Sequence, residues 1–286
     1  MSTFSSLLLS LLPPPQATEE EYPPAFLRMA ELLLNQAILR VAGVPHRLVE
    51  IEVYVNGPHH RDTFTHNDPM QKNGGTWYFH RFGGRYRTGN YKGLDIAIGN
   101  ENTFGGVLIR SIEQLEPERK IFDGPCVCVN HLLLLNRAPS VDHLVSRFDL
   151  RIDKPTGGEP ILHLELAPTP RQQPIFACPR VGLTLRRSAS VERQKFLARS
   201  YRFLSEPRAI RKGKPHLVIG LHREGKTAAE IAAISGVSLA NVVRYLDAFE
   251  AGKGSIADHY RDVLCSEHLC ELLGACDRHV VGAGGF

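Results

Sequence analysis

The sequence predicts an α+β protein that ends in a small all-helical module. Three observations predict this class. Strand-like segments recur through the first two thirds of the chain, among them residues 47–54 and 107–113. Segments with apolar residues at helical spacing lie among these strands. After a basic stretch at residues 208–215, the composition changes and helix signals follow one another closely.

Length and composition limit the class of protein. The chain has 286 residues, 43% of them hydrophobic and 22% charged, which is an ordinary globular mixture. That length is sufficient for one large domain and one small one. The net charge of +4 permits a polyanionic partner without requiring one.

The first residues predict neither secretion nor a membrane anchor. Residues 1–12 are rich in leucine, but no Lys or Arg precedes the apolar run, and the run is too short to span a bilayer. The six cysteines are not spaced as a disulfide framework, which favours a reducing compartment. We therefore expect an intracellular monomer, in a nucleus or a bacterial cytoplasm, that has no contact with a membrane.

The predicted elements begin after a lead-in at residues 1–23. We expect this lead-in to be disordered, because three prolines and an acidic run end its apolar stretch. A helix is predicted next from the spacing of apolar residues, and residues 56–75 form a long polar loop. The predicted helices are 24–35 and 126–135, and the predicted strands are 38–41, 47–54, 77–82, 94–98, 107–113, 160–166, 179–183 and 201–204.

The last part of the chain predicts a helix-turn-helix module over residues 216–255, after a basic linker at 208–215. Thr227-Ala228-Ala229-Glu230 is a capping box, and Gly236 supplies the turn before the last helix. Asn241 and Arg244 would face a DNA groove from that helix. Residues 213–255 hold five basic and four acidic side chains, so a module for protein contacts or a packing appendage remains open.

The tail at residues 256–286 contains Cys and His residues whose spacing fits no compact zinc motif. We expect no metal there. A helix over 261–279 with buried leucines explains the pattern better.

Two charged residues on predicted strands point to a functional site. Glu52 and Arg110 lie in segments whose other residues predict buried strands. An unpaired charge in a buried sheet costs roughly several kcal/mol. A carboxylate beside apolar and aromatic groups is suited to act as a general base. An ion pair with a purely structural role remains the alternative.

Several short motifs occur in one order along residues 25–203. They are Glu50-Ile51-Glu52-Val53-Tyr54, His66, Gly75-Thr76-Trp77-Tyr78, Val107-Leu108-Ile109-Arg110-Ser111-Ile112-Glu113, Gly124-Pro125 with Cys128 and Asn136, and Pro179-Arg180-Val181-Gly182. This order resembles the alkyladenine (3-methyladenine) DNA glycosylase family. The resemblance implies a curved antiparallel sheet with flanking helices over residues 24–207. It also implies an enzyme that flips a damaged base out of double-stranded DNA and hydrolyses its N-glycosidic bond.

The resemblance also implies roles for single residues. Glu52 would activate a water molecule, which Arg110 and the backbone carbonyl of Val181 would position. The rings of Tyr54 and His66, with His80, would hold the flipped base. Neither a cofactor nor a metal is implied.

The chain departs from the family pattern at the base pocket. Asp95 stands where the family has Asn, and a carboxylate only accepts hydrogen bonds, so the preferred base is open. Phe82-Gly83 is the best match to the Tyr-Gly wedge of the family. Basic residues crowd the same hairpin and would face phosphates, although they could instead protect a strand edge: Arg81, Arg85, Arg87 and Lys92.

Two other functions compete with this interpretation. One is a DNA-binding protein without catalysis on the same scaffold. The other is hydrolysis of a modified base that is not an alkylpurine.

Overall fold

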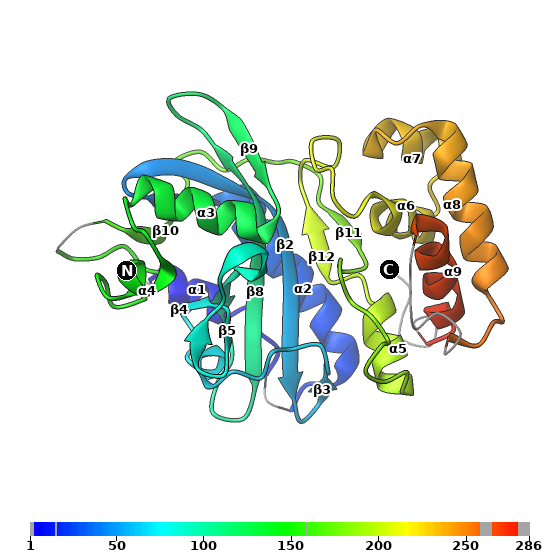
Figure 1. The fold of residues 1–286 in the computed structure, drawn as a ribbon, viewed down its shortest axis with the longest axis horizontal. Coiled ribbons are helices and arrows are strands. Elements are labelled where there is room, and N and C mark those ends of the chain that lie inside the picture. Colours follow the sequence, from blue (N-terminus) through cyan, green and yellow to red (C-terminus); the bar gives the residue numbers. More distant parts are fainter. Residues whose placement is uncertain (1–2, 15, 158–159, 258–264, 280–286) are drawn as a thin grey trace. The chain divides into compact units, whose positions relative to one another are not determined.

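The computed structural model describes residues 3–14, 16–157, 160–257 and 265–279. The protein has an α+β fold in which an antiparallel sheet is flanked by helices, and further helices follow in the C-terminal part (Figure 1). The α-helices are α1 (Phe4–Leu9), α2 (Tyr22–Glu31), α3 (Pro125–Leu135), α4 (Val141–Val145), α5 (Val191–Ala198), α6 (Lys214–Arg223), α7 (Ala228–Ser235), α8 (Leu239–Gly252) and α9 (Ser266–Asp277). The strands are β1 (Ala37–Val41), β2 (Val44–Gly57), β3 (His60–Arg61), β4 (Thr76–Phe79), β5 (Arg81–Phe82), β6 (Arg85–Tyr86), β7 (Leu94–Ala97), β8 (Phe104–Gln114), β9 (Lys120–Asp123), β10 (Leu162–Leu166), β11 (Phe176–Cys178) and β12 (Arg202–Leu204).

The chain divides into two compact units. Unit 1 holds Met1–His60 and Thr65–Ile175, and unit 2 holds Arg61–Phe64 and Phe176–Phe286. Unit 2 therefore combines the C-terminal helices with residues 176–207, which the sequence assigns to the preceding domain.

The sheet of unit 1 follows the order β10-β1-β2-β8-β7-β4, and β9 pairs with β8. These pairings are antiparallel. β1 and β2 are joined by a tight turn in which Ala42 and Gly43 have φ values of 48° and 81°, as a two-residue hairpin requires. The predicted strands at 38–41, 47–54, 94–98, 107–113 and 160–166 are confirmed.

One face of this sheet is apolar across four strands. Ile51 lies opposite Ile109, and Val107 lies opposite Ile96. Ile96 in turn lies opposite Trp77. These side chains are at most 1% exposed. Since successive side chains of a strand point to opposite sides, the residues between them form a second face, and that face carries the polar groups.

Helices cover the sheet of unit 1. The predicted helix at 24–35 is α2, which continues into a π-helical turn at Leu32–Gln36 that contacts β1 and β2. Phe26 and Met29 of α2 are fully buried. The predicted helix at 126–135 is α3, which packs against β8 and β9 (Figure 1).

The lead-in is folded in its described part, contrary to the expectation of disorder over residues 1–23. Thr3 caps α1 by accepting a hydrogen bond from the backbone N–H of Ser6. Leu8 is fully buried, and the Ser5 hydroxyl donates to Asp153. The leucine run is thus a packing surface of unit 1.

The predicted strand at 77–82 is interrupted at His80. β4 ends at Phe79, and β5 pairs only with β6 in a separate hairpin. Gly83 and Gly84 form its turn with φ values of 57° and 79°, which side chains rarely adopt.

The second segment of unit 2 starts at Phe176, in β11. This strand pairs antiparallel with β12, and Ala177 lies opposite Phe203. The strand predicted at 201–204 is confirmed as β12. The strand predicted at 179–183 is wrong, because the strand ends at Cys178 and Gly182 has a φ of 84° in the turn that follows.

The helices of unit 2 include the three short ones predicted for residues 216–250. The capping box of Thr227 and Glu230 is present, and Gly236 ends α7 in the left-handed conformation. The Ser238 side chain caps α8. The directions of α7 and α8 differ by 119°.

The core of unit 2 is built chiefly on α5, α8 and α9, and among its buried members are Leu197, Phe249, Leu272, Leu273 and Cys276. The helix predicted at 261–279 corresponds to α9. Residues 261–264 of that prediction lie outside the described residues.

Within the described ranges, no single helix is long and apolar enough to cross a membrane. The helices α7 and α8 reach that length and apolar composition only when they are counted together, and a sharp bend separates them.

Candidate active site

Residues of four strands form one row on the polar face of unit 1. Glu52 of β2 and Asp95 of β7 both lie opposite Leu108 of β8. Tyr78 of β4 lies opposite Asp95. Cross-strand partners share a face of the sheet, so these four side chains point to the same side. With strands about 4.8 Å apart, the backbones of Glu52 and Asp95 are about 10 Å apart.

Gly106 of β8 makes room on this face. It lies opposite Tyr54 on one side and Ala97 on the other. A Cβ atom at position 106 would lie 2.5 Å from Asp95 Oδ2 and 3.0 Å from Gln71 Nε2. The glycine therefore allows the Asp95 carboxylate to lie over the sheet beside Tyr54.

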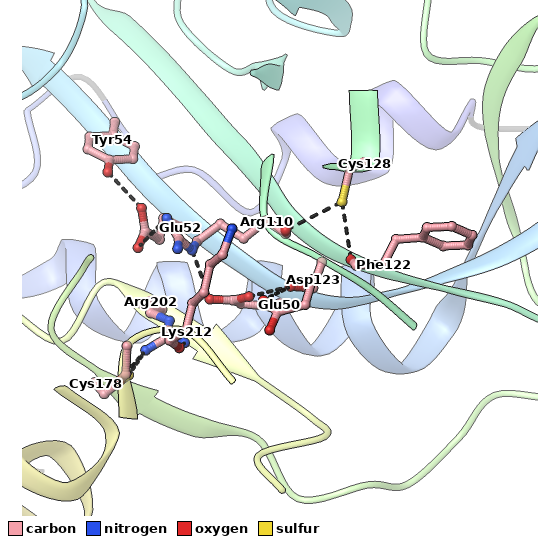
Figure 2. Close-up of polar contacts among 12 residues, drawn as sticks. Glu50, Glu52, Tyr54, Arg110, Phe122, Asp123, Cys128, Cys178, Arg202 and Lys212 are labelled. Atoms are coloured by element: carbon pink, nitrogen blue, oxygen red, sulfur yellow. Dashed lines mark hydrogen bonds and ion pairs between the residues drawn. The ribbon is translucent and has the colours of Figure 1, made fainter. Parts of the chain in front are cut away.

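Arg110 lies on the same face, two residues after Leu108 on β8, next to two shifts in register. The pairing of β2 with β8 shifts between Leu48 and Glu50, and again between Glu50 and Ile51. In the second shift Arg110 is the extra residue of β8, so Arg110 and Ser111 together oppose Glu50. The Sγ–H of Cys128 on α3 donates to the Arg110 carbonyl at 3.3 Å, which holds the backbone there (Figure 2).

Glu50 is the closest acidic partner of Arg110. Arg110 Nε donates to Glu50 Oε1 at 2.8 Å (Figure 2). The Ser111 hydroxyl donates to the other oxygen of Glu50. Both oxygens of this fully buried carboxylate are therefore bonded.

Glu52 joins the same network. Arg110 Nη1 lies 3.3 Å from Glu52 Oε1, and the Tyr54 hydroxyl donates to Glu52 Oε2 at 2.7 Å (Figure 2). Glu52 is fully buried and Arg110 is 5% exposed. Burial acts to lower the pKa of Arg110, but the carboxylates of Glu52 and Glu50 outweigh it and raise that pKa above its ordinary value. The guanidinium is therefore a permanent charge between two acids.

The structure thus brings together the three residues that the sequence assigns to one site on β2 and β8, namely Glu52, Tyr54 and Arg110. Their catalytic and base-binding roles stay predictions. Sequence reasoning missed Glu50. The spacing is the signal that could have revealed it, because Glu50 and Glu52 are two residues apart on one strand and therefore share a face.

A second polar group occupies the other end of the row. His80 Nε2 lies 2.7 Å from Asp95 Oδ1, and the two side chains are 12% and 3% exposed. The Gln71 amide donates to Asp95 Oδ2 at 3.4 Å. Asp95 therefore orients His80 and has both of its oxygens bonded, and its role in choosing the base stays a prediction.

His66 packs against His80, so these two predicted pocket residues do lie together. Their ring centroids are 4.3 Å apart in an edge-to-face arrangement, and the Tyr78 hydroxyl lies 3.4 Å from His66 Nδ1. His66 keeps an exposed edge, but desolvation by the groups packed on it, and then the charge of His80, lowers its pKa to about 4. Burial also raises the pKa of Tyr78. Both groups are thus neutral at pH 7.

The hairpin β5–β6 carries the predicted DNA-binding residues of unit 1. Phe82 is 77% exposed at its tip, next to Gly83, and the Arg87 guanidinium lies 5.5 Å from the Phe82 ring centroid. Arg85 is exposed and Lys92 is partly exposed.

Arg81 has a different environment from the other arginines of this hairpin. Its guanidinium donates to both oxygens of Asp68, at 2.6 and 3.1 Å. This bidentate pair anchors the hairpin to the preceding loop.

Val181 belongs to unit 2, whereas Glu52 belongs to unit 1. Val181 Cγ2 would lie 2.3 Å from a Cβ atom at Gly213, so it packs on that glycine. The neighbouring Arg180 is bonded to Asp62 in the interior of unit 2. The role predicted for the Val181 carbonyl stays a prediction.

The two residues of α8 that were predicted to face a DNA groove have different surroundings. Asn241 is partly exposed in the first turn. The side chain of Arg244 is 57% exposed and pairs with Glu267 of α9 at 2.8 Å.

Within the described ranges, no group of three or more His, Cys, Asp or Glu side chains is arranged to hold a metal ion. The six cysteines, all in described positions, are free thiols. Cys270 and Cys276 lie in the core of unit 2, where burial raises the pKa of each to about 12.

Comparison with known proteins gives a relative but no function. No family model matches the chain. An uncharacterized protein of Acanthamoeba polyphaga mimivirus is 33% identical to it over 193 residues, which are 58% of this chain and 84% of the viral protein. At that identity and coverage, the chain belongs to the same family as this mimivirus protein.

Proposed function

We propose that the protein is a monofunctional DNA N-glycosylase of the alkyladenine glycosylase type. It extrudes a modified base from double-stranded DNA and hydrolyses the N-glycosidic bond with a water molecule activated by Glu52. The observation that carries the proposal is the row on the polar face of unit 1. There Glu52, held by Arg110 and Tyr54, lies opposite the same β8 residue as Asp95.

The Glu50–Arg110–Glu52 network suits base catalysis by a carboxylate. Two hydrogen-bonding partners fix the orientation of Glu52, so little reorganisation is needed when it takes a proton from water. Its negative charge also stabilises the positive charge that develops on the sugar as the base departs. Glu50 balances the charge of Arg110 and leaves Glu52 to act on the substrate.

The neighbouring groups suit a flipped base and its duplex. The rings of Tyr54, His66 and His80 offer stacking surfaces, and Asp95 and Gln71 lie next to them. The exposed Phe82 at a tight two-glycine turn has the position of a wedge that fills a vacated base stack. Arg85 and Arg87 beside it can pair with phosphates.

The pair α7–α8 would act as a helix-turn-helix module that adds contacts to DNA. Its support is the Gly-containing turn and the 119° between the helices, within the range of known DNA-binding pairs of about 90–120°. Asn241 would face the groove from the first turn of α8. Arg244 would have to leave Glu267 to do the same.

One observation favours a second candidate, a DNA-binding protein without catalysis. Glu52 is fully buried and both of its oxygens have partners, which also fits a structural ion network.

An incision assay separates these two candidates. Duplexes that each carry one modified base are incubated with the wild-type protein, with Glu52→Gln and with the control Glu101→Gln, which changes an exposed turn residue. Alkali-labile sites are then measured. We expect Glu52→Gln to slow base release by about 100-fold or more, and the control to match the wild type. Equal product from wild type and Glu52→Gln would remove Glu52 from the mechanism. Tight, salt-sensitive binding without product would favour the second candidate.

A further inference from the structure

Three arginines of unit 1 surround one carboxylate outside the candidate active site. Glu113 of β8 is 8% exposed. Arg119, in the turn between β8 and β9, lies 3.1 Å from Glu113 Oε1, and Arg171 lies 3.6 Å from Oε2. Arg47 of β2 lies directly opposite Glu113 in the sheet, so the two side chains share a face. These four residues are called the arginine cluster below.

The backbone fixes two of the three arginines. Arg47 lies within the pairing of β2 with β8. The Arg171 N–H donates to the Asn35 carbonyl at 2.8 Å, and the buried Asn35 side chain bonds to the N–H and the carbonyl of Gln173. Arg119 differs from both, because its side chain is largely exposed on a turn. The cluster therefore has two cations in fixed positions and a third that is free to reorient.

The cluster carries more positive charge than its carboxylate can balance. Burial lowers the pKa of Arg47 below its ordinary value, the charge of Arg171 lowers it further, and Glu113 opposes both. All three guanidinium groups nevertheless stay charged at pH 7. Glu116 and Glu118 in the same turn are exposed, and neither forms an ion pair with these arginines within the described ranges. Three guanidinium groups around one buried acid thus leave two positive charges.

One hydrogen-bond donor of the cluster has no acceptor in the protein. Arg47 Nη1 is buried, and no hydrogen-bond partner for it lies among the described residues. Buried donors in native proteins are nearly always bonded, and a donor that is not bonded to protein commonly meets a water molecule or an ion. The excess of positive charge around Arg47 favours an anion at this position.

We propose that the arginine cluster binds a phosphate group. Guanidinium groups present planar pairs of N–H donors that match the oxygens of a phosphate, and three of them approach from different segments of the chain. The two excess positive charges equal the charge of a phosphate dianion. Glu113 acts as a positioning residue that holds the guanidinium groups together, and Arg119 turns from Glu113 towards the ligand. The inference does not rest on the proposed glycosylase function.

Two sources offer this chemistry, a free phosphate ion and the backbone of DNA. Arg47 lies five residues from Glu52 along β2, a span of about 17 Å, so a duplex held at the candidate active site extends far enough to reach the cluster. The test therefore has one arm for each source.

The first arm measures inorganic phosphate binding by isothermal titration calorimetry at constant ionic strength. We expect Arg47→Gln and Arg119→Gln each to raise the Kd by about 10-fold or more, because each removes charged hydrogen bonds to the ligand. Arg47→Lys keeps the charge and loses the paired donors, so an intermediate Kd is expected. Arg151→Gln, at an exposed position of unit 1, is the matched control and should bind as the wild type does. If Arg47→Gln fails to fold, the exposed Arg119→Gln decides.

The second arm measures the binding of an unmodified duplex by fluorescence anisotropy over a range of salt concentrations. If the DNA backbone supplies the phosphate, Arg119→Gln should weaken binding and reduce the slope of log K against log salt by about one unit. A loss confined to inorganic phosphate would identify a free phosphate ion as the ligand. The proposal is overturned if neither phosphate nor duplex affinity differs between the wild type and the variants. A wild type that releases no base would end the proposed function only, because neither measurement depends on catalysis.

Discussion

The charge network of β2 and β8 and the helix pair α7–α8 are held together in opposite ways. Arg110 and Glu50 are 60 residues apart in sequence and are buried. Thr227 and Glu230, which cap α7, are three residues apart and exposed. The first region depends on a long-range register, and the second on a local motif.

This difference sets the size of the effect expected from a single substitution. A buried charge without its partner is far more unfavourable than an exposed donor without its cap, since water can solvate the second and not the first. Four experiments test that ranking.

The largest effect is expected from Arg110→Leu. The substitution removes the Arg110 guanidinium from two buried carboxylates, Glu50 and Glu52, and should lower the free energy of unfolding by about 3–5 kcal/mol. Urea unfolding at pH 7 measures it. Arg119→Leu is the control, because its side chain is 66% exposed and its pair with Glu113 is worth at most about 1 kcal/mol. Similar small losses in both variants would show that the buried network contributes no more than a surface pair.

Gly106→Ala should have the next largest effect. The new methyl group would meet Asp95 Oδ2 at 2.5 Å and force the carboxylate away from His80, at a cost of about 1–3 kcal/mol. Gly157→Ala serves as control, because no atom lies within 4 Å of its Cβ position, and its change should stay within about 0.5 kcal/mol. Unfolding of both variants at the same urea concentration would show that the polar face has room for a methyl group at position 106.

Thr227→Ala should destabilise unit 2 by only about 1 kcal/mol, because it removes a solvent-exposed cap. Thermal unfolding followed by circular dichroism measures the change, and Thr227→Ser, which keeps the hydroxyl, should recover most of it. A loss as large as that of Arg110→Leu would contradict the contrast between the two regions.

The last effect concerns pH, and solvent screening reduces it because His66 is exposed. The pKa of His66 in the folded protein is about 4, below its ordinary value of 6.5, because of desolvation and then the charge of His80. A lowered folded pKa means that the unfolded chain binds the proton more readily. The contribution of His66 to stability is therefore complete above pH 6.5 and is lost as the pH falls through 4. An NMR titration of the histidine ring checks this, and a midpoint near 6.5 would contradict it.

The local features were predictable from the sequence, and the long-range ones only in part. The capping box at Thr227, the turn at Gly236 and the strand at 107–113 each follow from residues that are neighbours in the chain. The meeting of Glu52 and Arg110 was expected from a resemblance, and the two do lie 3.3 Å apart.

The rest could not be predicted because it depends on which residues become neighbours in space. Glu50 meets Arg110 only once β2 and β8 pair in their observed alignment, and Asp95 is bonded to His80 only because Gly93 and Gly106 leave space for both. The folded lead-in was missed for a similar reason, since Leu8 is buried by contacts that its own segment does not encode.

The two shifts in register between β2 and β8 compensate each other. Val49 is the extra residue of β2 in one shift and Arg110 that of β8 in the other, so the pairs on either side, Leu48 with Ile112 and Ile51 with Ile109, keep a common alignment. Deletion of either residue alone would slide one strand past the other and exchange inward and outward positions along half its length. Relatives of this chain are therefore expected to gain or lose these two residues together.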